Sequence, residues 1–250
     1  MQRRLVAEFL GTFALVFAGT GAIVFNDLSA GEFSEGVIGH IGIAATFGLI
    51  VMAMIHTFGD ISGAHLNPAV TLAFAFSKRF EGKAVLGYLM AQCLGAIAAS
   101  ASLVFLAPWS TNLGATVPIY DFGLRTFVLE TYLTFLLMTV ILHVSTGAKE
   151  KGITAGIAIG GTVGLMALFA GPYTGASMNP ARSLGPALME ALAGQPGPMA
   201  LQKLWIYLLA PTLGALGAVL LCRFLRTEGC CGDTDCGPTA PAPDEDERRD

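Results

Sequence analysis

Two nine-residue segments of this chain are nearly the same, and their positions limit the folds that are open to it. SGAHLNPAV occupies residues 62–70 and TGASMNPAR occupies residues 174–182. Both lie among long apolar stretches, in a chain that is 54% hydrophobic and only 13% charged. This composition is typical of a membrane protein. Any fold for the chain must therefore place two copies of an Asn-Pro-Ala turn among membrane-spanning helices.

Six apolar stretches are long enough to cross a bilayer as helices, since a span needs about 20 mostly apolar residues. The first follows Arg3 and Arg4 but is too long for the core of a leader peptide and has no A-x-A site after it. We therefore expect it to be a retained helix. The predicted spans cover residues 5–25, 37–58, 83–106, 123–144, 153–171 and 201–225.

Each copy of the repeat lies in a segment that is too short to cross, over about residues 62–77 and 174–191. Asparagine is a favourable N-cap, and proline at the first helical position loses no hydrogen bond. Each Asn-Pro-Ala turn therefore predicts the start of a short half-helix. The turns are Asn67, Pro68 and Ala69 in the first copy and Asn179, Pro180 and Ala181 in the second.

The chain divides into two three-span repeats, about residues 1–107 and 122–226. AEFLGT at residues 7–12 opens the first span, and LETYLT at residues 129–134 lies in the fourth. Because three is odd, the second repeat starts on the opposite side of the membrane, so its half-helix enters from the opposite face. We expect the two turns to meet near the midplane of one all-α domain over residues 1–226.

Positive charges near the span ends indicate the orientation. Most of these Lys and Arg residues fall on the side that carries both termini, whereas Arg125 and Lys203 fall on the other. By the positive-inside tendency, both termini of a multi-pass cell-membrane protein would be cytoplasmic. The sequence has no basic patch that would indicate nucleic-acid binding.

Residues 227–250 form an acidic tail rich in Gly, Pro and Cys, which we expect to be disordered. Its thiols could hold a soft metal. A reduced, unstructured cluster or a lipidated tail is the more common outcome for such a sequence. The thiols belong to Cys230, Cys231 and Cys236.

The meeting point of two half-helix N-termini predicts a path for neutral solutes. Non-helical backbone at membrane depth is tolerated only where it is buried in protein or lines a water-filled cavity. Each helix N-terminus carries about half a positive charge, so two such ends repel cations and protons. The amides of the two asparagines would donate to a passing oxygen. The expected acceptors are the carbonyls of Gly63, Ala64 and His65 and of Gly175, Ala176 and Ser177.

The two copies differ at their last position, where Val70 corresponds to Arg182. A lone arginine inside a membrane is costly and by default functional. A buried salt bridge is the alternative, but no acidic residue follows in this segment before Glu190. We expect Arg182 to add one cation to the outer half of the pore.

The two Asn-Pro-Ala boxes, the SGAHLNPAV lead, the NPARS continuation and the paired glutamates resemble the major intrinsic protein family, the aquaporins, over residues 3–226. The resemblance implies a channel rather than an enzyme, without a cofactor, and a homotetramer with one pore per subunit. It implies that Glu8 and Glu130 are buried carboxylates that bind the backbone of the two loops. It also implies an outer selectivity filter of four side chains, which map onto Phe47, Ala167, Ala176 and Arg182.

This filter departs from two common types within the family. Strict water channels usually have a histidine where this chain has Ala167, and glycerol channels usually have an aspartate where it has Ser183. The run at residues 170–188 is most similar to the plant nodulin-like branch and its bacterial relatives. That similarity implies passage of water, glycerol, urea and boric or arsenous acid. A strict water channel is the first alternative, and an anion-permeable channel is a more distant one.

Three assignments stay open at this point. Helix packing explains small residues such as Ala167 equally well, so Gly164 or Leu168 could face the pore instead. His65 either lines the pore or ties its loop down. Five apolar residues could be pure core, but by the repeat spacing they would form an apolar wall opposite the carbonyls. Its members would be Leu15, Val51, Val70, Leu137 and Val163.

Overall fold

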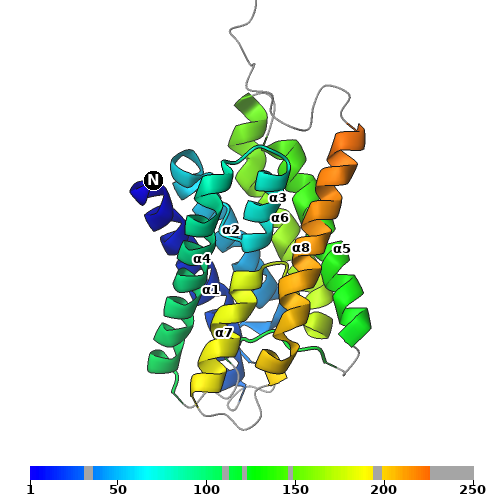
Figure 1. The fold of residues 1–250 in the computed structure, drawn as a ribbon. Coiled ribbons are helices and arrows are strands. Elements are labelled where there is room, and N and C mark those ends of the chain that lie inside the picture. The colour runs from blue at the N-terminus through cyan, green and yellow to red at the C-terminus, as the bar shows by residue number, and fades with distance from the viewer. Residues whose placement is uncertain (31–35, 109–112, 120–122, 146–148, 194–198, 226–250) are drawn as a thin grey trace, which may run out of the picture.

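The computed structural model describes the chain except residues 31–35, 109–112, 120–122, 146–148, 194–198 and 226–250 (Figure 1). The tail with its three cysteines is thus outside the described residues. The helices of the described part are α1 (Gln2–Ser29), α2 (Gly39–Ser62), α3 (Pro68–Phe76), α4 (Gly82–Leu106), α5 (Gly123–Val144), α6 (Lys149–Thr174), α7 (Pro180–Leu192) and α8 (Met199–Leu225).

Six of these helices are long and apolar enough to cross a membrane: α1, α2, α4, α5, α6 and α8. The prediction of an all-α membrane protein with six spans and two half-helices is confirmed. Figure 1 shows α3 and α7 as the two short helices, one in each half of the bundle, with their near ends facing each other.

The ends of the long helices differ from the sequence prediction. Helices α2 and α6 continue through Ser62 and Thr174, beyond the expected ends at 58 and 171. Each stops at a glycine in the left-handed region, Gly63 with φ 86° and Gly175 with φ 83°. The amide of each glycine still donates to the carbonyl four residues earlier, at 2.9 Å. Such a left-handed glycine is a common helix end, and here it leads the chain directly into the repeat.

The two halves of the chain pack in the same pattern. Helix α1 contacts α2 and α4, and α5 contacts α6 and α8 in the same way. The halves join where α2 packs on α6. Each half-helix lies between α4 and α8, because α3 and α7 both contact these two helices. The order long, long, short, long therefore repeats in sequence and in space.

Three glycine contacts bring the long helices together. A Cβ built on Gly95 of α4 would lie 2.4 Å from the Phe9 carbonyl oxygen, and one on Gly214 of α8 would lie 2.2 Å from that of Thr131. A Cβ on Gly160 of α6 would lie 2.5 Å from the carbonyl oxygen of Gly48 in α2. The helix backbones touch at these points, so no side chain fits there.

Candidate functional site

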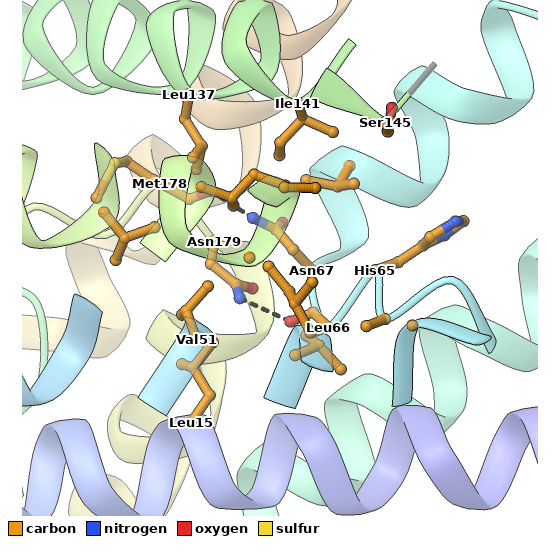
Figure 2. A pocket seen from close by; sticks show the side chains of 18 of the residues that line it. Leu15, Val51, His65, Leu66, Asn67, Leu137, Ile141, Ser145, Met178 and Asn179 are labelled. Carbon is orange, nitrogen blue, oxygen red and sulfur yellow. Dashed lines mark hydrogen bonds between the residues drawn. The ribbon is translucent and has the colours of Figure 1, made fainter. Parts of the chain in front are cut away.

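The two Asn-Pro-Ala turns touch in the middle of the fold. The Asn67 side-chain amide donates to the Met178 carbonyl at 2.7 Å, and the Asn179 amide donates to the Leu66 carbonyl at 2.8 Å (Figure 2). Each half-helix thus binds the loop that leads into the other. An asparagine amide has two protons, and the bond to the opposite loop uses one of them.

The same asparagines begin the half-helices. The Asn67 side-chain oxygen accepts from the Ala69 amide at 2.9 Å. The Asn179 oxygen accepts from the amides of Ala181 and Arg182, at 3.0 and 3.3 Å. Pro68 and Pro180 occupy the first helical turn. Because the oxygen of each side chain is held by its own helix, the amide nitrogen faces the opposite loop and the cavity.

The loops before the asparagines have a costly backbone conformation. Ala64 and Leu66 have φ values of 45° and 51°, and Ala176 and Met178 have 40° and 54°. A non-glycine residue in this region costs roughly 1–2 kcal/mol. The loops keep this shape only because other groups hold their amides.

Two buried carboxylates hold those amides. Glu8 of α1 accepts from the amides of His65 and Leu66 at 2.9 and 2.7 Å. Glu130 of α5 accepts from the amides of Ser177 and Met178 at 2.9 and 3.0 Å. These loop amides have no helix carbonyl to bind, and leaving them unbound would be expensive. The two glutamates therefore support the loops rather than line the cavity.

A second pair of supports was not predicted from the sequence. The Tyr88 hydroxyl donates to the Ser62 carbonyl, and the Tyr207 hydroxyl donates to the Thr174 carbonyl, both at 2.7 Å. The hydroxyls of Ser62 and Thr174 in turn donate to Glu8 and Glu130, also at 2.7 Å. A signal was present in the sequence, because YLMAQCLGA from residue 88 and YLLAPTLGA from residue 207 are a further internal repeat.

One support exists in the first half alone. The Gln92 amide of α4 donates to Glu8 at 2.8 Å and to the Thr71 hydroxyl at 2.9 Å. By the tyrosine repeat, Pro211 stands at the matching position of α8 and has no side-chain donor. In the second half, the Ser183 hydroxyl instead binds those of Thr116 and Ser177.

A cavity of about 740 Å³ passes both asparagines. One end lies at the predicted filter, where Phe47, Ala167, Ala176 and Arg182 line it. The other end is lined by residues that were not predicted from the sequence, among them His56 and Asp60 of α2 and Ser145 directly after α5. Between these ends lie Leu15, Val51, Gly63, Ala64, His65, Asn67, Val70, Leu137, Val163, Ser177 and Asn179.

Not every predicted residue lies on this cavity. Gly175 is outside its lining, and a Cβ on it would lie 3.0 Å from a methyl carbon of Thr116. Of the three candidates on α6, Ala167 lines the cavity, whereas Gly164 packs near Gly48 and Leu168 is 41% exposed on the outside.

Arg182 is 2% exposed and held by the backbone of a loop. Its Nη1 donates to the Gly114 carbonyl at 2.6 Å, and its Cζ lies 5.1 Å from the centre of the Phe47 ring. Among the described residues no carboxylate forms an ion pair with it. The described residues therefore do not form the salt bridge that was the alternative role for Arg182. The sequence carried no signal for Gly114, which is 68 positions away.

His65 contacts the cavity and also anchors its loop. Its Nδ1 lies 3.1 Å from the Thr71 hydroxyl oxygen. Its ring packs among those of Phe74, Phe80 and Tyr88, with centre distances of 4.8, 4.8 and 5.2 Å. His65 therefore does both of the things that the sequence left open: it lines the cavity and it holds its loop.

Six spanning helices around a cavity, with two half-helix N-termini meeting at its centre, define a membrane channel. The model for the major intrinsic protein family matches residues 1–222, and the chain belongs to this family. It is therefore a multi-pass membrane channel of the aquaporin or aquaglyceroporin type.

Individual relatives agree with the family. The chain is 43% identical to nodulin-26 of Glycine max over 225 residues, which covers 90% of this chain and 78% of that protein. It is 40% identical to aquaporin NIP3-1 of Arabidopsis thaliana over 241 residues, covering 90% and 68%. Among solved structures, the aquaglyceroporin from Plasmodium falciparum is similar with a TM-score of 0.76 and 26% identity, over 88% of this chain and 95% of that one.

Proposed function

We propose that this channel passes water and small uncharged solutes down their gradients and excludes protons and ions. The observation that carries the proposal is the cavity that passes both asparagine amides at the N-termini of α3 and α7. Two helix N-termini at one point produce a positive potential, which opposes cations and leaves neutral molecules unaffected. Arg182, buried at the filter end, adds a full positive charge.

The filter side chains support a solute range beyond water. Ala167 and Ala176 contribute only methyl groups, whereas Arg182 offers hydrogen-bond donors and Phe47 an apolar face. A neutral solute fits such a passage when its hydroxyl or amide groups face the donors of Arg182 and its carbon or compact core faces the apolar side. Glycerol, urea and boric or arsenous acid have this chemistry. Ser183 does not add to the passage, because its hydroxyl is bound to those of two neighbours.

Orientation and assembly are also proposals. We propose cytoplasmic termini, with the Arg182 end of the cavity outside, in the cell membrane. We also propose a homotetramer with one pore per subunit. The tetramer is carried over from the family; the apolar side chains on the outer surface, such as Ile41, Leu124 and Leu165, which are 75%, 78% and 59% exposed, fit contact with lipid as well as with another subunit.

The proposal is tested in proteoliposomes by stopped-flow light scattering. Shrinkage in sucrose reports water permeability, and re-swelling in glycerol, urea or boric acid reports solute permeability. We expect the parent to pass water and solutes, and Ala167→His to block the solutes while water still passes. A parent that passes water alone would support the strict water channel instead.

The anion alternative needs a separate measurement. In planar bilayers of the same preparation, we expect no current above background with chloride or nitrate as the permeant ion. A chloride current that disappears on Arg182→Val would favour an anion-permeable channel and contradict the proposal.

A further inference from the structure

Phe47 lies between the cavity and a glycine of α1. A Cβ built on Gly19 would lie 2.2 Å from Cε1, 2.5 Å from Cδ1 and 2.6 Å from Cζ of the Phe47 ring. The ring thus occupies the space that any side chain at position 19 would fill. It is only 8% exposed although it lines the cavity, since α1 covers it on this side.

This contact differs from the helix-crossing contacts of Gly95 and Gly214 and is of the same kind as that of Gly156, where a Cβ would meet the His56 ring. Gly95 and Gly214 admit the backbone of a neighbouring helix, which is the usual use of glycine at a helix crossing. The three nearest atoms to a Cβ on Gly19 all belong to one aromatic side chain. Gly19 therefore makes room for a ring rather than for a helix.

The backbone of α2 beside the ring cannot move away from α1. A Cβ on Gly48 would lie 2.7 Å from the Gly160 carbonyl oxygen and 3.0 Å from Gly164 Cα, so α2 is packed directly against α6. If a side chain at position 19 pushed on Phe47, the ring would move and the helix would not. The free space next to the ring is the cavity, where the guanidinium of Arg182 lies beyond it.

The next residue of α1, Thr20, packs against the loop that binds Arg182. A Cβ on Gly114 would lie 2.7 Å from Thr20 Cβ, and the Gly114 carbonyl is the one that binds Arg182. Two consecutive residues of α1, Gly19 and Thr20, therefore lie beside Phe47 and beside the loop that binds Arg182.

We propose that Gly19 is a positioning residue that sets the width of the filter by letting the Phe47 ring lie back against α1. The inference rests on the proposed function and deepens it, because it places a determinant of solute size outside the four filter side chains. A methyl group at position 19 would move the ring toward Arg182 and narrow the passage for glycerol more than for water.

A double-mutant cycle tests this inference in proteoliposomes. Water and glycerol permeability are measured for the parent, Gly19→Ala, Phe47→Ala and the double variant. We expect Gly19→Ala to lower glycerol permeability about tenfold, which corresponds to about 1.4 kcal/mol of added barrier, with a smaller effect on water. In the Phe47→Ala background, the same change should have no effect on either rate.

Gly21→Ala is the matched control, because it adds the same methyl to α1 two positions along. A Cβ there would lie 3.3 Å from Cδ2 of Leu103, which does not line the cavity. We expect it to leave the ratio of glycerol to water permeability unchanged. Equal losses of water and glycerol in Gly19→Ala, or the same loss without the Phe47 ring, would overturn the inference.

Folding is followed by thermal unfolding of all four proteins in detergent. We expect Gly19→Ala to be destabilising in the parent and harmless in the Phe47→Ala background. If Gly19→Ala does not fold, the double variant must fold and behave as Phe47→Ala does; a double variant that also fails contradicts the inference. A parent without glycerol permeability refutes the proposed solute range, and the cycle is then read from water permeability and thermal unfolding.

Discussion

Arg182 is the side chain that most distinguishes the two copies of the repeat. It combines burial, a hydrogen bond to Gly114 and a ring contact with Phe47. The equivalent position in the first repeat holds Val70, which lines the same cavity without a charge. The repeat itself thus shows that the backbone tolerates an apolar residue at this position.

Arg182→Val should therefore fold but conduct differently. Removing the buried cation lowers the electrostatic barrier to cations and widens the filter. We expect glycerol permeability to rise and proton flux, measured with an entrapped pH-sensitive dye, to increase about tenfold or more, which is a barrier change of about 1.4 kcal/mol. An unchanged proton flux would show that the half-helix ends suffice for proton exclusion. The single variant Leu168→Val, a change on the outer surface, is the control.

A second prediction compares the two buried glutamates. In Glu130→Gln the new amide nitrogen must face a loop amide, either Ser177 or Met178, and two donors then meet. In Glu8→Gln the new amide nitrogen also faces a loop amide, that of His65 or Leu66, but on the Leu66 side the Gln92 side chain can turn its oxygen, which has no partner among the described residues, toward it and supply one acceptor. An unsatisfied buried group costs about 1–3 kcal/mol. We expect Glu130→Gln to lower the midpoint of thermal unfolding more than Glu8→Gln does; the reverse order would contradict this account.

Helices in this fold touch through backbone at a few points, and those points determine how the halves join. The α2 to α6 contact is the clearest, because Gly48 and Gly160 approach from facing helices. A Cβ on the neighbouring Gly161 would meet nothing within 4 Å among the described residues. Adjacent glycines on one helix therefore have different roles, which composition alone does not reveal.

Gly160→Ala and Gly161→Ala should thus have opposite effects. The first places a methyl 2.5 Å from the Gly48 carbonyl oxygen and forces the helices apart. Overpacking of this kind costs about 1–3 kcal/mol. The second meets no obstacle and gains up to about 1 kcal/mol of helix propensity. Thermal unfolding in detergent, with water permeability as a check of the pore, would distinguish them. Similar unfolding midpoints for both variants would show that the α2 to α6 contact is adaptable.

At the scale of the whole molecule, the last helix of the described residues ends at Leu225, and the family match ends at residue 222. The acidic tail that follows lies outside the described residues and beyond the family match. We expect a chain that ends at Arg226 to keep the thermal stability and the water and glycerol permeabilities of the full chain. A change in permeability without a change in stability would indicate that the tail regulates the channel.

Much of this architecture was accessible from the sequence, because its signals are local. Apolar runs of about 20 residues predict spans, and Asn-Pro-Ala predicts a capped half-helix at Pro68 and at Pro180. The odd number of spans per repeat then requires the two turns to approach from opposite faces. The hydrogen bonds of Asn67 and Asn179 to the opposite loops confirm that the turns meet.

Tertiary structure alone decided which groups complete the site. Gly114 binds Arg182 across 68 positions, and Gly19 meets Phe47 through helix packing that no sequence pattern encodes. It likewise packed Gly175 beside Thr116, outside the cavity lining. The reason is physical: periodicity and capping act within one or two turns of a helix, whereas the width of a pore depends on how distant side chains share the same space.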